Sequence, residues 1–300
     1  MIGHHKIFSF FEGALEHQSL GHSYCLVGPE QIGKRTLARL VAATLLKTSI
    51  DRLDTHPDFF YLERMVDEKT GKRKKELIVE QARQLKARLQ TTSWVQGYRV
   101  VIIDEVEAVN EEAGNALLKL LEEPPKQVIF FLLTTNDDLL LPTIRSRTQI
   151  LQMGCVSDEE IKSHLCNQSI SSELINEVLP LSWGRPGRAV ALLKNFEVRE
   201  SNKNYIQKLE RMMAEPIYER FKTVEELCGG KKEESVSREE LDRVLEVWIM
   251  WWRDRLLRVD KISQRSIQNK NILDRLYSAR QMVWRNVNPR LLLENTVVEM

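Results

Sequence analysis

The stretch from residue 100 to residue 125, VVIIDEVEAVNEEAGNALLKLLEEPP, constrains the fold of this chain more than any other. It opens with an unbroken run of β-branched side chains, which favours a strand covered on both faces in a parallel sheet. Asp104 and Glu105 follow at the carboxyl end of that strand, where open α/β sheets bind their ligands. After Asn110 as a cap, alanine and leucine recur at helical spacing until two prolines stop the helix. We therefore expect an α/β domain built around this strand.

An apolar strand that ends in Asp-Glu has the form of a Walker B element, in which the aspartate holds the nucleotide's magnesium ion and the glutamate orients the attacking water. The alternative is an ordinary buried strand followed by two solvated acids. A loop upstream favours the first interpretation, because GPEQIGK lies between a short strand, 22–27, and a helix. This is the context of a P-loop, in which backbone N–H groups cradle phosphates. Gly28, Gly33 and Lys34 are its expected nucleotide-binding residues.

The residue after this lysine departs from the P-loop pattern. Working loops have Ser or Thr there to ligate magnesium, whereas this chain has Arg35, and a guanidinium cannot ligate a cation. Thr36 comes one position later, which on a helix turns its side chain by about 100°. The loop could still hold ATP, but we expect magnesium binding to be weak or absent and hydrolysis to be inefficient.

Composition argues against several other classes of protein. There are 44 lysines and arginines against 43 acidic residues, so no overall charge draws the chain to nucleic acid or membrane. The four cysteines lie far apart without a CxxC pair, which argues against disulfides and a zinc site and fits a reducing, cytoplasmic compartment. His56 has no second histidine or cysteine nearby, so a structural role is expected. No apolar run is long enough to span a bilayer, and we expect no membrane association.

Further strands and helices complete the predicted architecture. Residues 128–133 form another apolar strand, and Asn136 shortly after it is placed where a γ-phosphate would be sensed. The alternation of strands with helices implies a parallel sheet covered on both faces. Ser157, with Glu160 three residues on, opens a helical segment in capping-box style. In the helical tail, leucine and tryptophan share one face of residues 241–256, which indicates a core or subunit interface rather than base stacking.

Together, the segments HSYCLVGPEQIGK, HPDF, VVIIDEVEAV, NALLKLLEEPP, LPTIRSRTQ and NVNPRLLLEN resemble the bacterial clamp-loader family of AAA+ proteins, over nearly the whole chain. The resemblance implies three domains: an AAA+ nucleotide-binding α/β domain in residues 1–154, a helical lid in 155–199 and an all-α collar in 200–300, through which subunits form a ring.

The resemblance also implies functional residues. In this family a Ser-Arg-Cys motif donates an arginine finger to ATP bound on the neighbouring subunit. Ser146 and Arg147 match it, and Thr148 stands in place of the cysteine. The alternative for Arg147 is an ion pair with a local carboxylate. The turn GRPGRA resembles the family's sensor-2 turn, with Arg188 where an arginine would face the nucleotide.

The ATP-hydrolysing gamma or tau branch of the family keeps Ser or Thr after the loop lysine and carries a four-cysteine zinc module just before the position of His56. This chain has Arg35 after the lysine and no cysteine in the short segment before His56. These two departures favour the delta prime branch. The implied function is that of a stator in the DNA polymerase III clamp loader, a non-catalytic subunit that joins gamma or tau and delta subunits in a hetero-pentameric ring. That ring loads the sliding clamp on primed DNA during DNA replication. Two alternatives remain: a gamma-like subunit that hydrolyses ATP itself, and a stand-alone nucleic-acid-binding protein acting through the basic run 69–75, KTGKRKK.

Overall fold

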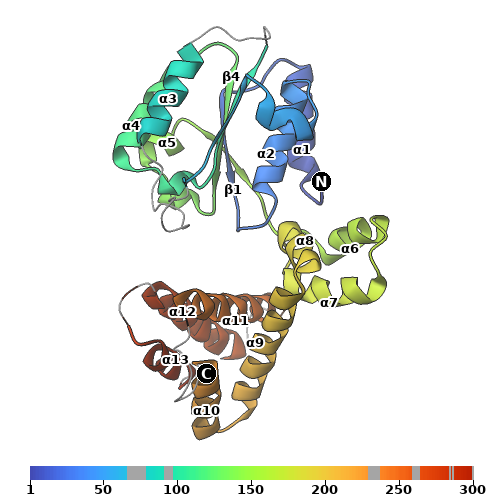
Figure 1. Cartoon of the computed structure of the whole chain (residues 1–300), viewed down its shortest axis with the longest axis vertical. Coiled ribbons are helices and arrows are strands. Elements are labelled where there is room, and N and C mark those ends of the chain that lie inside the picture. Colours follow the sequence, from blue (N-terminus) through green and yellow to red (C-terminus); the bar gives the residue numbers. More distant parts are fainter. Residues whose placement is uncertain are drawn as a thin grey trace. The chain divides into compact units, whose positions relative to one another are not determined.

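The computed structural model describes residues 1–65, 79–90, 97–228, 237–258, 264–283, 285 and 287–298. The chain divides into two compact units, Met1–Val190 and Ala191–Met300, shown in Figure 1. The basic run 69–75 lies outside the described residues. Most of the segment expected to form a lid belongs to the same unit as the α/β domain, and the division into three domains stays a prediction.

The first unit is built on a five-stranded parallel sheet. Its strands are β1 (Ser23–Val27), β2 (Phe59–Leu62), β3 (Arg99–Ile103), β4 (Val128–Thr134) and β5 (Gln149–Gln152), in the order β2-β3-β4-β1-β5. The three central strands are buried at every position, which explains their continuous apolar runs. The predicted parallel α/β sheet is confirmed. Because β4 pairs with both β1 and β3, the loop after β1 and the carboxylates after β3 share one edge of the sheet.

Helices cover both faces of this sheet (Figure 1). Helices α1 (His5–Glu16) and α2 (Lys34–Leu45) pack on one face, and α3 (Val79–Gln90), α4 (Glu111–Glu122) and the short α5 (Pro142–Arg145) on the other. Alternate residues of β3 enter the two cores: Val100 and Ile102 contact the first layer, Val101 and Ile103 the second. Short 3-10 turns, η1 (Ile50–Thr55), η2 (Val106–Ala108) and η3 (Asp137–Leu139), join these elements.

Local signals set several helix ends. The Asn110 side chain accepts a hydrogen bond from the Ala113 backbone N–H (2.9 Å), and Ser157 accepts one from Glu160 (3.2 Å), so both predicted caps are confirmed. After Ser157 the first unit continues with α6 (Asp158–Asn167), α7 (Ser172–Ser182) and the start of α8 (Pro186–Lys194). Phe8, Phe11 and Leu15 recur at helical spacing and predict an amphipathic helix over residues 7–20. The observed helix α1 runs from His5 to Glu16, and Gln18 beyond it takes a left-handed φ of 52°.

All regular elements described beyond α8 are helices: α9 (Phe196–Ala214), α10 (Ile217–Leu227), α11 (Arg238–Arg258), α12 (Gln264–Val283) and α13 (Pro289–Val297). Trp248 is fully buried, and its indole N–H donates to the Tyr205 carbonyl at 3.0 Å. The same face of α11 also buries Leu241, Leu245 and Trp252. The predicted stripe of leucine and tryptophan therefore forms the core of this unit.

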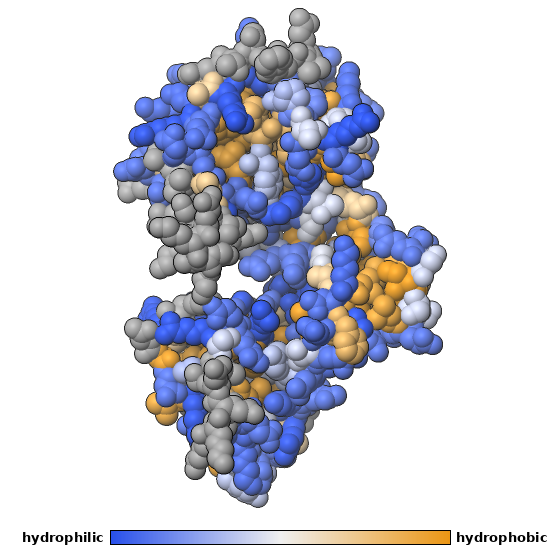
Figure 2. Space-filling model, viewed as in Figure 1, coloured by the Kyte–Doolittle hydropathy of each residue, from blue (hydrophilic) through white to orange (hydrophobic). Residues whose placement is uncertain are grey.

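Hydrophilic side chains predominate on the face of the chain drawn in Figure 2, as the high and balanced content of charged residues leads one to expect. In that view, apolar side chains gather over the α6 and α7 segment. Among the helices of the described residues, none combines the length and apolar character needed to cross a bilayer.

Candidate functional site

The loop between β1 and α2, residues 28–33, and Lys34 at the start of α2 form the predicted phosphate cradle. Gly33 has a φ of 110°, which favours glycine. The Lys34 ammonium donates to the Gly28 carbonyl at 2.5 Å and to the Pro29 carbonyl at 3.1 Å. Burial lowers the pKa of Lys34, while the nearby carboxylates of Glu107 and Asp104 act in the opposite direction. The lysine side chain is therefore hydrogen-bonded to carbonyl groups of its own loop.

Gly28 is confined by the end of the neighbouring strand. A Cβ atom at this position would lie 2.4 Å from the Met153 carbonyl oxygen, so glycine is required for packing. The Gly28 N–H donates to the Thr134 carbonyl at 3.2 Å and continues the pairing of β1 with β4. Thr36, the hydroxyl residue one position too late, is exposed.

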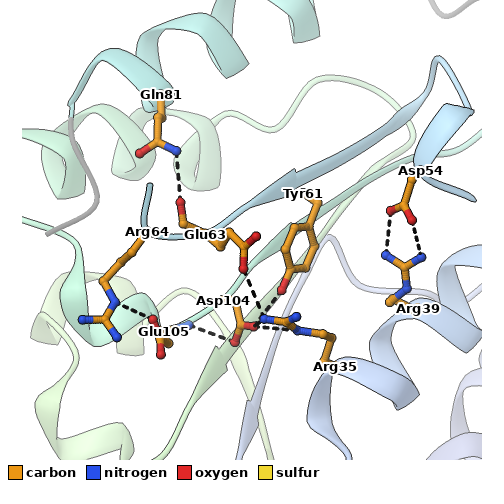
Figure 3. Close-up of polar contacts among 9 residues, drawn as sticks. All are labelled: Arg35, Arg39, Asp54, Tyr61, Glu63, Arg64, Gln81, Asp104 and Glu105. Atoms are coloured by element: carbon orange, nitrogen blue, oxygen red, sulfur yellow. Dashed lines mark hydrogen bonds and ion pairs between the residues drawn. The ribbon is translucent and has the colours of Figure 1, made fainter. Parts of the chain in front are cut away.

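Arg35 lies against the predicted magnesium ligand (Figure 3). Its Nη2 and Nε atoms are 2.6 and 3.0 Å from Oδ2 of Asp104, and Nη2 is 3.3 Å from Glu63. The Tyr61 hydroxyl donates to the same Asp104 oxygen at 2.7 Å, and the guanidinium stacks 5.1 Å from the Tyr61 ring centre. Burial, and then the hydrogen bond to Asp104, raise the pKa of Tyr61. Asp104 is thus fully engaged by groups of the chain.

Glu105 also has an arginine partner. Arg64 Nε lies 2.5 Å from Glu105 Oε2, and the Glu105 backbone N–H donates to Asp104 Oδ1 at 3.0 Å (Figure 3). Both acids of the Walker B element therefore face guanidinium groups. These residues do not fit a magnesium-bound nucleotide, because Arg35 stands beside Asp104 where the metal ion would be. Among the described residues there is no cluster of three or more His, Cys, Asp or Glu side chains that could hold a metal ion.

Part of this cluster was not predicted from the sequence. Tyr61, Glu63 and Arg64 come from the end of β2 and the residues after it, and they reach Asp104 and Glu105 because β2 pairs with β3. The signal was present, since YLER also ends an apolar strand at the binding edge of the sheet. His56, in contrast, has the structural role expected, because its Nδ1 atom accepts from the Asp58 backbone N–H at 3.2 Å.

Asn136 follows the strand next to β3, as the sequence predicted. Its side chain accepts a hydrogen bond from the Asp138 N–H at 3.0 Å and caps the turn η3. The preceding residue, Thr135, donates through its hydroxyl to Glu107 at 3.2 Å. A sensing role for Asn136 stays a prediction.

The first turn of α8 contacts the loop through its backbone. Gly187 N–H donates to the Gln31 carbonyl at 2.8 Å, and a Cβ atom on Gly187 would lie 2.7 Å from that oxygen. Arg188 is buried, with its Nε donating to the Leu181 carbonyl at 3.0 Å and its guanidinium 4.4 Å from the Trp183 ring centre. Gly187 therefore contacts the loop through its backbone, and a nucleotide contact by Arg188 stays a prediction.

Ser146 and Arg147 lie at the opposite edge of the sheet. Arg147 Nη2 is 2.7 Å from Glu122 Oε1, and Nη1 donates to the Thr143 carbonyl (3.1 Å) and the Ser146 hydroxyl (3.2 Å). These residues border a concavity of about 500 Å³, here called the arginine pocket, lined by His22, Leu121, Glu122, Ser146, Arg147 and Thr148. The local ion pair foreseen as an alternative for Arg147 is present in the single chain.

The arginine pocket is far from the chain's own loop. His22 precedes β1 and Gly28 follows it, and the six steps along the extended chain from one to the other, at about 3.3 Å each, put roughly 20 Å between them. Arg147 comes two residues before β5, as His22 comes just before β1. Because β5 runs parallel to β1, both residues lie at the amino-terminal edge of the sheet. The guanidinium of Arg147 therefore cannot reach phosphates held by residues 28–34 of its own chain.

Comparison with known protein families assigns the first half of the chain. Residues 3–156 match the family described as DNA polymerase III, delta subunit. The chain is 31% identical over 231 residues to the DNA polymerase III subunit delta' of Pseudomonas aeruginosa, covering 70% of this chain and 66% of that protein. It is 33% identical over 150 residues to the same subunit of Escherichia coli K12, covering 49% and 43%. These alignments span less than two thirds of the relatives' own length.

A solved structure shares the fold. The crystal structure of a DNA polymerase III, gamma subunit-related protein from Thermotoga maritima aligns with a TM-score of 0.53 at 18% identity. The alignment covers 96% of this chain and 97% of that one.

Proposed function

The chain belongs to the delta prime family of bacterial DNA polymerase III clamp-loader subunits, and on that premise we propose that it acts as the stator of the loader in DNA replication. It joins gamma or tau and delta subunits in a hetero-pentameric ring through residues 200–300, and this ring loads the sliding clamp on primer-template DNA in the cytoplasm. In this role the subunit does not turn over ATP. Family membership and the delta' relatives support the proposal.

In this role Arg147 contacts the nucleotide bound to the neighbouring subunit, as an arginine finger. The observation that carries this proposal is the position of Arg147, at the sheet edge opposite to the chain's own loop, with its guanidinium in a surface concavity. A guanidinium inserted in trans stabilises the charge that develops on the transferring phosphoryl group. Ser146 supports it, because the serine hydroxyl accepts a hydrogen bond from Arg147 Nη1.

In this proposal the chain's own loop neither binds magnesium nor supports ATP hydrolysis. Arg35 neutralises Asp104, Arg64 engages Glu105, and Lys34 is turned onto the loop carbonyls. The gamma-like alternative requires Asp104 to hold magnesium, so the Arg35 contacts count against it. No described residue favours the stand-alone nucleic-acid-binding alternative, since the basic run on which it depends lies outside the described residues.

Substitution of Arg147 tests the finger. In the assembled loader, Arg147→Ala is expected to slow hydrolysis at the one site it serves by about 10³-fold or more, so that steady-state ATPase loses the contribution of that site. Arg145→Ala is the matched control, because Arg145 comes from the same short segment but pairs with Asp137 and Asp138. An unchanged ATPase rate with Arg147→Ala in a correctly assembled ring would refute the finger.

Ligand-induced stabilisation tests this property of the loop. A ligand that binds only the folded state raises the melting temperature, by an amount that grows with its concentration above Kd. We expect any shift that millimolar ATP produces in the melting temperature of the purified chain to be the same with Mg²⁺ as with EDTA, and the chain to show no ATPase activity. Turnover by the isolated chain that disappears with Lys34→Ala would contradict this part of the proposal and favour the gamma-like alternative.

A further inference from the structure

The arginine pocket contains an anionic group of the chain itself. Glu122, at the end of α4, is the one carboxylate among the six residues that line the concavity, and it lies 2.7 Å from Arg147. The remaining polar lining residues, His22, Ser146 and Thr148, carry N–H or O–H groups. Glu122 and Arg147 have side chains that are 47% and 36% exposed, so both can be reached from outside the chain.

The contacts of Arg147 differ in kind on its two sides. Nη1 is held by Thr143 and Ser146, which belong to the same short segment and move with the arginine. Nη2 is held by Glu122, from a helix on the other side of the pocket. A carboxylate oxygen and a phosphate oxygen make the same charge-assisted hydrogen bond to a guanidinium. Glu122 therefore occupies the contact that an incoming phosphate would need.

We propose that Glu122 is an internal competitor for Arg147. It holds the guanidinium in the pocket of the free subunit and yields it to the terminal phosphate of the nucleotide on the neighbouring subunit. This inference rests on the proposed in-trans role of Arg147. Glu122 is accordingly a positioning residue, because it acts on the phosphate only through Arg147.

The size and place of the effect follow from the exposure of the pair. Exposed ion pairs contribute little, so the need to break this pair first weakens the competing interaction with phosphate by only about two- to five-fold. The pair has to break before Arg147 can touch the phosphate, in the bound substrate and in the transition state alike. An interaction that changes both states equally alters KM and leaves kcat unchanged. At the neighbouring subunit's site, which Arg147 serves, the KM for ATP is therefore expected to be higher with the Glu122 carboxylate than without it.

The test uses the assembled loader and its steady-state ATPase. Glu122→Gln keeps the shape of the side chain and removes its charge, and it should lower the KM for ATP about two- to five-fold with kcat unchanged. Glu123→Gln is the matched control, because it removes the same charge from the adjacent exposed position. In the Arg147→Ala background, Glu122→Gln should have no effect, since a competitor matters only while its guanidinium is present.

The outcomes separate this inference from the proposed function. If Arg147→Ala slows the loader but Glu122→Gln leaves KM unchanged, or Glu123→Gln lowers it equally, the competitor role is wrong and the finger stands. If Arg147→Ala leaves the ATPase unchanged, the finger itself fails. A lower KM with Glu122→Gln that persists in the Arg147→Ala background would also overturn the inference, because the effect would not pass through Arg147.

Discussion

At the scale of single residues, Arg35 pairs with the predicted magnesium ligand of the phosphate loop. Its guanidinium lies beside Asp104, and Tyr61 and Glu63 complete its surroundings. The missing Ser or Thr was evident from the sequence. The destination of the arginine was not, because Asp104 is 69 residues away along the chain and reaches Arg35 only through the order of strands in the sheet.

This arrangement predicts a loss of stability with Arg35→Ala. Asp104 is only 14% exposed, and without Arg35 it keeps the Tyr61 hydroxyl and the Glu105 N–H but loses its ion-pair partner. Hydrogen bonds to charged groups contribute about 1.5–3 kcal/mol, and the exposure of Arg35 reduces this. Urea denaturation should show a loss of about 1 kcal/mol in the free energy of unfolding. In the double variant with Asp104→Asn the loss should be smaller than the sum of the single losses, and simple additivity would argue against the coupling.

At the scale of elements, the strands were more predictable than what connects them. The three central strands were foreseen to within one residue at each end, because a strand buried on both faces is a continuous apolar run. The end of α1 was missed, since it depends on a left-handed Gln18 that no residue type demands. The Arg64 partner of Glu105 was missed for a different reason: it exists only because β2 pairs with β3.

Glycine substitutions test the contact between α8 and the loop. Gly187→Ala would place a Cβ atom 2.7 Å from the Gln31 carbonyl, so the helix or the loop must shift, and overpacking of this kind costs about 1–3 kcal/mol. Gly13→Ala in the middle of α1 meets no atom within 4 Å and should stabilise the protein by about 0.5–1 kcal/mol. Denaturant midpoints of the two variants should therefore move in opposite directions. Equal shifts would mean that the backbone at 187 is not tightly packed.

At the scale of the whole molecule, the chain consists of two units with separate cores. The sheet of the first unit buries Cys25 on its central strand β1, and burial raises the pKa of this thiol to about 12. At neutral pH it is a protonated and inaccessible thiol, whereas Cys155 and Cys166 are exposed. Cys25 is thus a natural reporter on unfolding of the first unit, and Trp248 anchors the second.

Separate cores predict separate responses to a core substitution. Trp248→Ala removes a fully buried indole and its hydrogen bond to Tyr205, which costs about 3–5 kcal/mol in the second unit. Iodoacetamide labelling with mass spectrometry should show Cys25 still protected at denaturant concentrations where far-UV circular dichroism reports loss of helix. Labelling of Cys25 in the same transition would show instead that the two units unfold together.

The cation beside Asp104, the Arg35 guanidinium, is covalently part of the chain, and this has a consequence for the protein in the cell. A cation that belongs to the polypeptide has an effective concentration at Asp104 fixed by covalent geometry, so neither chelators nor swings in free magnesium can strip it away. We expect the electrostatics of this strand end to be the same in a starved cell as in a growing one. In the proposed ring, such a subunit would contribute a strand end whose charge does not depend on the free magnesium concentration.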